Sequence, residues 1–166
     1  MPGSEPRIAN LLTFDLEGQR SAVLATDVLE VQRAVAMTVL PRGPPLVEGV
    51  IDLRGKLVPV LDIRARLGLR AHSLALSDQF VIVRVSRGGT GQEAGSRVVA
   101  IRVDRALELV PVPMSMLEDP RTVAGAAEVA GAAKLPDGLL LIHDLRRFLS
   151  LEEELRLDRA LEGSPA

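Results

Sequence analysis

The chain of 166 residues contains no cysteine, no tryptophan and no tyrosine, and only three phenylalanines and two histidines. Without cysteine there is no disulfide framework, no thiolate metal site and no cysteine nucleophile. Metal sites usually need several convergent ligands, and neither HxH nor HExxH spacing occurs in the sequence. We therefore predict no metal site and no cofactor. His72 is expected to be exposed in a loop, and His143 to be structural at a strand end.

A large charge excess and long apolar runs are also missing. The formal net charge of −2 argues against a protein that coats nucleic acid or an anionic membrane. Without Trp or Tyr, few aromatic side chains could stack on bases. No apolar run approaches 18 residues, and the N-terminus lacks a signal pattern. We expect a cytoplasmic protein that neither binds nucleic acid nor inserts into a membrane.

Catalytic motifs are the third absence. Neither a GxSxG elbow nor a GK[ST] phosphate loop occurs. The glycine-rich residues 88–95 lie between two predicted strands, so we interpret them as a hairpin loop rather than a phosphate site. The sequence predicts no enzyme. A nucleotide-binding enzyme on a β scaffold and a nucleic-acid-binding barrel are alternatives from other classes, but no motif favours either.

Short segments rich in β-branched and apolar residues dominate what is present. Residues 28–31 either continue the second strand or begin a third. The proline-rich residues 41–45 can only be a connector. Short helices are expected at 62–67, with Asp62 as N-cap and Gly68 behind it, and at 144–149, capped by Asp144. Ser150 and Glu153 form a capping box that opens a helix carrying Leu151, Leu155 and Leu161. The predicted strands are 11–16, 21–26, 50–53, 57–63, 79–86, 97–110, 129–135 and 139–142.

Two stretches of the chain resemble each other. Residues 47–69 align without a gap on residues 129–151, with eight identical positions of 23. A weaker echo relates residues 22–31 to residues 100–109. Two copies of one β unit with few helices suggest two small packed barrels. We expect one domain over 10–161, with a first half at 10–70, a second half at 78–150, a terminal helix at 151–161 and a flexible leader at 1–9.

Four blocks of the sequence carry a resemblance to a known family: 13–31, 47–68, 98–109 and 129–149. The most specific is the second, in which GVIDLRG (49–55) is followed by PVLDIR (59–64). Its structural motif residues are Gly49, Asp52, Leu53, Gly55 and Asp62. Over nearly its whole length the chain resembles the CheW-like coupling proteins of bacterial chemotaxis. Residues 113–128 do not read clearly as family sequence, so their role is left open.

The resemblance implies a mainly β fold: two packed SH3-like five-stranded barrels with short helices and a C-terminal helix. It also implies a non-catalytic adaptor or scaffold in a chemosensory two-component system. The implied partners are the regulatory domain of a CheA-type histidine kinase and the cytoplasmic tip of methyl-accepting chemoreceptors, in arrays at the membrane. An alternative is a gliding, pilus or developmental pathway that uses one partner only. Weak self-association is a further expectation.

The site residues implied by the resemblance lie around the Arg54-Gly55 turn. An Arg54–Glu30 ion pair is expected to fix the hairpin against an earlier strand and shape the wall of an apolar groove between the barrels. The proposed groove lining is Val28, Val31, Val50 and Leu57. Local sequence alone favours a solvated turn residue beside a permissive glycine, and it is the resemblance that favours a site-organising role for Arg54.

Overall fold

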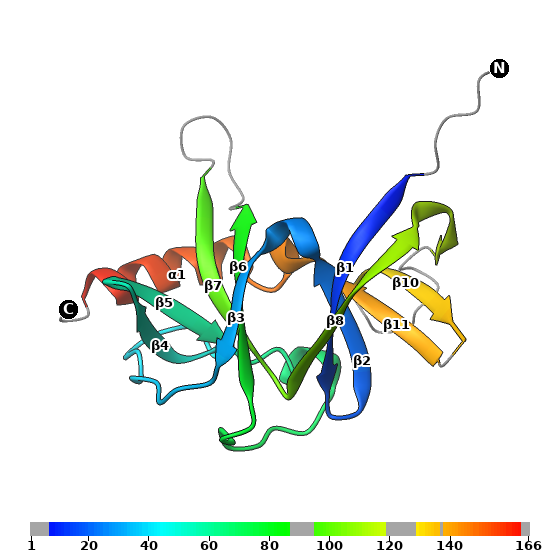
Figure 1. Cartoon of the computed structure of the whole chain (residues 1–166). Helices are drawn as coiled ribbons and strands as arrows, with labels where there is room; N and C mark the ends of the chain where they lie inside the picture. The colour runs from blue at the N-terminus through cyan, green and yellow to red at the C-terminus, as the bar shows by residue number, and fades with distance from the viewer. Residues whose placement is uncertain (1–6, 87–94, 119–128, 137, 164–166) are drawn as a thin grey trace.

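The computed structural model describes residues 7–86, 95–118, 129–136 and 138–163. Within these ranges the protein is mainly β, with short 3₁₀ turns and one C-terminal helix (Figure 1). The first β segment already begins at Ile8, so residues 8 and 9 are not a leader; residues 1–6 lie outside the described part. The elements are β1 (Ile8–Leu16), β2 (Gln19–Leu24), η1 (Ala25–Asp27), β3 (Val28–Arg33), β4 (Val47–Leu53), β5 (Lys56–Leu61), η2 (Ala65–Leu67), β6 (Gln79–Ser86), β7 (Ser96–Val103), β8 (Arg105–Pro113), η4 (Met114–Met116), β9 (Leu117–Glu118), β10 (Val129–Leu135), β11 (Gly138–His143), η6 (Leu145–Arg147) and α1 (Leu151–Glu162).

The strands form two sheets, each bent into a small SH3-like barrel. One sheet has the order β3-β6-β7-β5-β4 and uses a single stretch of chain, 28–103; we call it the continuous barrel. The other has the order β8-β1-β2-β11-β10-β9 and takes strands from both ends of the chain; we call it the split barrel. The barrels lie side by side in Figure 1. Each therefore mixes strands from the expected halves 10–70 and 78–150, while the predicted two-barrel fold is confirmed.

Both internal sequence echoes correspond to equivalent structure. The first echo aligns Val60 with Ile142, and the second aligns Ala22 with Ala100. In the continuous barrel Val60 pairs with Ala100 across the parallel contact of β5 and β7, and in the split barrel Ile142 pairs with Ala22 across that of β11 and β2. The β4–β5 and β10–β11 hairpins also share an irregularity at the same aligned place, between Val47 and Gly49 and between Val129 and Gly131. The repeat is thus one β unit used twice.

The chain passes from one barrel to the other at Asp104. The sequence predicted one strand over 97–110, but the structure has two, because β7 ends at Val103 in the continuous barrel and β8 starts at Arg105 in the split barrel. The Asp104 N–H donates to the Asp15 carbonyl at 2.9 Å. Residues 28–33 likewise form a separate strand, β3, after the η1 turn. An apolar run long enough for one strand cannot reveal such a crossing.

One hydrophobic core spans both barrels. Its members include Phe14 and Val23 of the split barrel, Val81 and Ile101 of the continuous barrel, and Phe148 after η6. Each barrel also has a smaller core of its own, and these occupy aligned positions: Ala133, Leu140 and Ile142 in one correspond to Ile51, Val58 and Val60 in the other. Because the largest core is shared, the two barrels form a single packed unit.

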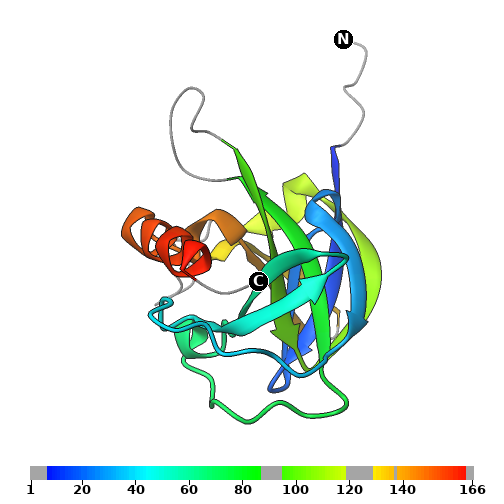
Figure 2. The ribbon, with the colours of Figure 1, turned by 90° about the vertical axis from the view of Figure 1, so that its left-hand side faces the viewer.

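Helix α1 packs on the continuous barrel rather than standing apart (Figure 2). The predicted capping box is present, since Ser150 Oγ accepts from Glu153 N–H at 3.1 Å and Glu153 Oε1 accepts from Ser150 N–H at 3.1 Å. Of the three leucines named from the sequence, only Leu161 packs on the barrel. Leu151 and Leu155 are exposed, while Leu157 and Ala160 are buried against Leu40 and Val50. The 12-residue helix is too short to span a membrane, and no other helix of the described ranges is longer.

The short turns differ in detail from the prediction. The helix expected at 62–67 is the 3₁₀ turn η2, whose N-cap is Arg64 rather than Asp62, although Asp62 Oδ1 does accept from Arg64 N–H at 3.1 Å. Gly68 ends it with φ 71°, as expected. Asp144 caps η6 by accepting from Arg146 N–H. The 88–95 loop lies outside the described residues except Gly95, but the flanking β6 and β7 pair antiparallel up to Ser86 and Ser96, as a hairpin requires.

Gly49 provides a test of how tightly the continuous barrel is closed. A Cβ at Gly49 would lie 2.7 Å from the Thr38 carbonyl oxygen and 2.9 Å from Met37 Cβ. The backbone of Thr38 is fixed there, because it exchanges two hydrogen bonds with Val50. We expect Gly49→Ala to lower the free energy of unfolding by about 1–3 kcal/mol, measured by urea denaturation. Gly95→Ala, where a Cβ meets nothing within 4 Å, should change it by less than about 0.5 kcal/mol. Equal effects would show that this contact is not tight.

Candidate functional site

The Arg54-Gly55 turn joins β4 to β5 and carries the predicted ion pair. Arg54 Nη2 lies 2.9 Å from Glu30 Oε2, which belongs to β3. The Arg54 side chain is 75% exposed and that of Glu30 is 29% exposed. The pair therefore belongs to the exposed class of ion pairs, which contribute about 0–1 kcal/mol to stability. Its geometry matches the prediction, and its effect on stability is expected to be small.

The backbone conformation of this turn indicates that Arg54 does more than connect β4 to β5. Arg54 has φ 52° and Gly55 has φ 86°, as in hairpin turns of the primed type. Gly55 N–H donates to Asp52 Oδ1 at 2.7 Å, so the motif residues Asp52 and Gly55 both stabilise the turn. Asn, Asp or Gly is usual at the first position, and a left-handed conformation costs other L-residues about 1 kcal/mol or more. The turn alone does not explain an arginine at this position.

The four residues predicted to line a groove do not share one surface. Val31 and Leu57 are each 38% exposed, and Leu57 lines a surface pocket of about 490 Å³ together with Leu29, Arg54 and Val98. Val28 is half-buried against the shared core. Val50 is 4% exposed and lies under α1. Val50 as groove lining was therefore wrong: its side chain faces the core beneath the C-terminal helix.

A second pocket, of about 400 Å³, lies between the two barrels. Its walls come from β2, β9, β10 and β11 of the split barrel and from β6 of the continuous barrel. Both apolar and charged side chains line it, and none of the four predicted lining residues takes part. The pocket is lined by Leu24, Asp27, Arg84, Val85, Ser86, Leu117, Gly131, Ile142, His143, Asp144, Leu145 and Arg146.

His143 forms the buried polar part of this pocket. It is 3% exposed, and its ring lies 6.3 Å from that of Phe14 and 5.8 Å from that of Phe148, centroid to centroid. Neither ring nitrogen has a hydrogen-bond partner among the described residues. Burial lowers the pKa of His143 to about 4. The ring is therefore neutral at pH 7 and behaves as part of the apolar wall, in agreement with the structural role predicted for it at a strand end.

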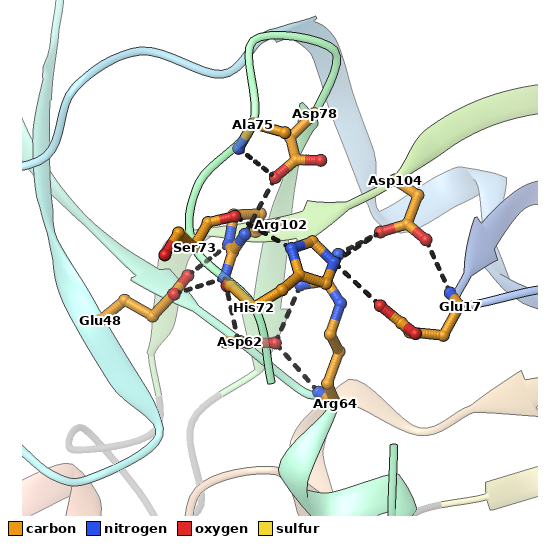
Figure 3. Close-up of polar contacts among 10 residues, drawn as sticks. All are labelled: Glu17, Glu48, Asp62, Arg64, His72, Ser73, Ala75, Asp78, Arg102 and Asp104. Atoms are coloured by element: carbon orange, nitrogen blue, oxygen red, sulfur yellow. Dashed lines mark hydrogen bonds and ion pairs between the residues drawn. The ribbon is translucent and has the colours of Figure 1, made fainter. Parts of the chain in front are cut away.

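A network of buried and half-buried charged side chains adjoins the motif of residues 49–64 (Figure 3). Most of its members were not predicted from the sequence. Arg102 of β7 is 1% exposed and bonds Glu48 through two nitrogens, at 2.8 and 2.7 Å. It also donates to Asp78 at 2.9 Å, to Asp62 at 3.2 Å and to the His72 carbonyl at 2.8 Å. Burial alone would lower the pKa of Arg102, but the hydrogen bonds to Glu48 and Asp78 raise it above its ordinary value.

The network continues through Arg64 to the crossing between the barrels. Arg64, whose side chain is fully buried, donates to Asp62 at 3.1 Å and to Asp104. Glu17 N–H donates to Asp104 Oδ2 at 2.7 Å. Burial raises the pKa of Asp104, yet the bonds from Glu17 N–H and Arg64 lower it overall. The motif residue Asp62 thus links the two buried arginines.

His72 was predicted to be exposed to solvent in a loop, but it contacts two carboxylates. Its side chain is 31% exposed, and Nε2 lies 3.1 Å from Glu17 Oε1 and 3.4 Å from Asp104 Oδ1.

Two motif residues not yet placed have structural roles. Gly49 is needed for close backbone approach, and Leu53 packs against the core of the continuous barrel. Besides the motif residue Asp62, the sequence signal for the network was Arg102, a charge inside the otherwise apolar strand VVAIRV.

The two arginines Arg102 and Arg54 make a matched test. Arg102→Met would leave Glu48, Asp62 and Asp78 without their buried cation, and we expect a loss of about 3–5 kcal/mol in the free energy of unfolding. Arg54→Met removes an exposed pair and should cost no more than about 1 kcal/mol. Urea denaturation of both variants measures the difference. Similar losses for the two would refute the division between a buried network and an exposed pair.

His143 should make stability depend on pH. Its pKa is near 6.5 in an unfolded chain and about 4 in the folded protein. Between these values the unfolded state binds a proton that the folded state does not, so stability falls as pH falls. We expect His143 to account for a loss of about 2 kcal/mol between pH 7 and pH 5. Urea denaturation at both values should show a smaller loss in His143→Phe; an unchanged loss would assign it to other groups.

Comparison with known proteins agrees with this geometry. Residues 10–153 match the model of the family described as CheW-like domain. The chain is 25% identical over 154 residues to "Chemotaxis protein CheW" of Treponema pallidum, covering 89% of this chain and 85% of that one. It is 33% identical over 121 residues to "Protein FrzA" of Myxococcus xanthus, covering 69% and 66%.

A solved structure has the same fold. The crystal structure of the scaffolding protein TtCheW from Thermoanaerobacter tengcongensis superposes with a TM-score of 0.74 at 26% identity, covering 92% of this chain and 95% of that chain. The match includes both barrels, since it extends over nearly the whole of each chain. The protein therefore belongs to the CheW-like domain family.

Proposed function

We propose that this protein is a non-catalytic cytoplasmic adaptor that couples methyl-accepting chemoreceptors to a CheA-type histidine kinase. The observation that carries the proposal is the presence of two candidate recognition surfaces on one rigid unit. One is the pocket between the barrels, and the other is the face around Arg54 on the continuous barrel; the two adjoin at Arg84, which lines both pockets. A bridge between two partners requires two distinct surfaces, and the shared core holds these in a fixed relation.

The pocket between the barrels suits the tip of a receptor, which is a helical hairpin. Leu24, Val85 and Ile142 supply an apolar floor, and Asp27, Arg84 and Arg146 supply charges beside it. An amphipathic helix places its apolar side in such a groove and its polar side against the rim. Neutral His143 adds to the apolar wall. This surface replaces the groove lining of Val28, Val31, Val50 and Leu57 expected from sequence.

The face around Arg54 suits the regulatory domain of the kinase. Leu29, Val31 and Leu57 are exposed apolar side chains of the continuous barrel, with 48%, 38% and 38% exposure. The ion pair of Arg54 and Glu30 lies beside them. A small apolar centre bordered by charged groups is the usual composition of a protein interface, and arginine is enriched among residues that dominate binding energy. In this proposal the ion pair holds Arg54 in position for the partner.

Two further features are part of the proposal. The adaptor is recruited to receptor arrays at the membrane through its partners. Weak self-association is expected because the two barrels are built alike: Leu57 and Leu139 occupy aligned positions and are 38% and 43% exposed. A barrel that pairs with a kinase domain of similar build could pair with its own repeat.

The similarity to "Protein FrzA" supports a second candidate. That relative is not named as a chemotaxis protein, and its identity over the matched region exceeds that of the Treponema pallidum protein. In this alternative the chain is an adaptor of a non-chemotaxis pathway, such as gliding, pilus motility or development, and uses only one of the two partners. The binding pattern separates the candidates: a coupling adaptor binds both partners, and the specialised adaptor binds one.

Arg54→Glu tests the proposal. The substituted side chain would repel Glu30 and present the wrong charge, so we expect binding to the kinase regulatory domain to weaken at least about tenfold. Binding to a receptor-tip fragment should not change, and the melting temperature should stay within a few degrees because the pair is exposed. Calorimetry with both partners from the same genome provides the measurement.

Two matched variants complete the experiment. Arg156→Glu on α1 makes the same charge change at an exposed position away from both pockets and should bind normally. The double variant Glu30→Arg with Arg54→Glu restores the ion pair; recovered binding would mean that Arg54 acts through the pair, and continued loss that it contacts the kinase itself. A wild-type chain that folds but binds neither partner would overturn the adaptor function.

A further inference from the structure

Three ligating side chains from distant parts of the sequence converge where the two barrels meet. Glu17 lies at the tip of the β1–β2 hairpin, His72 in the segment between η2 and β6, and Asp104 at the crossing from β7 to β8. One nitrogen or oxygen atom of each lies within 4.8 Å of the others. The Nε2 atom of His72 faces both carboxylates, at 3.1 and 3.4 Å (Figure 3).

The hydrogen bond of His72 Nδ1 determines which ring nitrogen is left to face the two carboxylates. His72 Nδ1 lies 2.9 Å from the Ser73 carbonyl oxygen. A carbonyl can only accept, so Nδ1 carries the proton of that hydrogen bond. With Nδ1–H used in this way, Nε2 faces two negatively charged oxygens, so either a proton or a metal ion has to lie between them. The arrangement of Nδ1–H on a carbonyl with Nε2 facing inward is that of metal-binding histidines.

The net negative charge of the surrounding groups also favours the binding of a cation. The connected network contains five carboxylates and two guanidinium groups, which leaves an excess of three negative charges before His72 is counted. The carboxylates are those of Glu17, Glu48, Asp62, Asp78 and Asp104, and the guanidinium groups are those of Arg64 and Arg102. A group of this charge binds a divalent ion more readily than a balanced one.

Arg64 gives a second, independent indication. Its side chain is fully buried, and its Nε–H has no acceptor among the described residues. In a guanidinium group Nε–H points to the same side as the Nη2–H, which here reaches Asp104. The Nε–H therefore lies on the edge of Arg64 that contacts Asp104. A water molecule held beside the ion could accept its hydrogen bond.

We propose that Glu17, His72 and Asp104 bind one divalent transition-metal ion of the Zn²⁺ class. Metal–ligand bonds of about 2.0–2.2 Å place neighbouring ligand atoms about 3–3.5 Å apart, and the two separations from Nε2 are of this size. One imidazole and two carboxylates suit Zn²⁺, Co²⁺ or Mn²⁺ better than Mg²⁺ or Ca²⁺. Glu17 N–H and Arg64 hold the Asp104 carboxylate from outside the ligand set.

The ion would cross-link the two barrels. Glu17 belongs to the split barrel, whereas His72 lies in the segment that leads into β6 of the continuous barrel, and its carbonyl is held by Arg102. Binding would thus fix this segment and the crossing at Asp104 against the β1–β2 hairpin. Such a role is independent of the adaptor function, because neither pocket described above includes these three residues.

The test is metal binding by the full chain, prepared without a histidine tag and freed of metal by chelator. Calorimetry with Zn²⁺ should give one site, and the melting temperature should rise with the logarithm of the free Zn²⁺ concentration once it exceeds the dissociation constant. Co²⁺ should give a visible absorption band. His72→Ala should weaken Zn²⁺ binding at least about tenfold and abolish the Co²⁺ band. Glu17→Gln, an exposed change at a hairpin tip, is the second variant and should weaken binding without loss of fold. Glu152→Gln on α1 is the control.

The outcomes separate a metal ion from a proton. A wild-type chain that shows neither Zn²⁺ heat nor a shift in melting temperature overturns the proposal, as does equal Zn²⁺ binding by wild type and His72→Ala. If the melting temperature of the wild type depends on pH through His72 but not on Zn²⁺, the cation between the carboxylates is a proton and the metal proposal is wrong. Normal binding by Glu152→Gln together with loss in both site variants supports it.

Discussion

The buried guanidinium of Arg102 is the interaction on which the arrangement of the two barrels depends. It draws together Glu48 of β4, Asp62 behind β5 and Asp78 ahead of β6. Asp62 also pairs with Arg64, and Arg64 pairs with Asp104, where the chain crosses from the continuous barrel to the split barrel. Removing one member leaves the others charged and buried, so the network acts as a unit. The connections of the continuous barrel and the crossing into the split barrel are thereby fixed together.

The shared core explains why such a charged junction is tolerated. One layer of apolar side chains runs through both barrels, and each barrel adds a small core at aligned positions. The repeat is not arranged as two successive halves. The chain begins one barrel with β1 and β2, builds the whole of the second with β3 to β7, and returns to complete the first. Because of this interleaving, the split barrel cannot be completed until the chain has crossed back at Asp104, which is where the charged network ends.

The sequence predicted local structure well and partnerships across the fold poorly. Hairpins with turn residues such as Arg54-Gly55, and the capping box of Ser150 and Glu153, depend on neighbours in the chain, so their residue types reveal them. The Glu30–Arg54 pair was found only through the resemblance to a family, since no local rule relates β3 to the β4–β5 turn. The crossing at Asp104 was missed because β7 and β8 together read as one apolar run.

The errors at single residues have the same origin. Val50 was assigned to a groove, but Leu157 and Ala160 of α1 cover it, and the position of that helix could not be foreseen. Leu151 and Leu155 were named as apolar residues of the helix, yet they are exposed, because the helix packs through Leu157, Ala160 and Leu161. His72 was expected in solvent, but Glu17 and Asp104 approach it from segments 55 and 32 residues away. Spacing in sequence cannot bring such groups together; only the topology does.

In the proposed function, stability and recognition are assigned to different charges of the same motif. Asp62 and Arg64, at the end of the motif, are buried and hold the barrels in place, whereas Arg54 at its turn is 75% exposed. The exposed arginine adds little to folding and accepts an unfavourable φ, so its presence is better explained by what it binds than by what it stabilises. Substitutions at the turn can then change affinity for a partner without unfolding the protein, because the buried end of the motif keeps both surfaces in register.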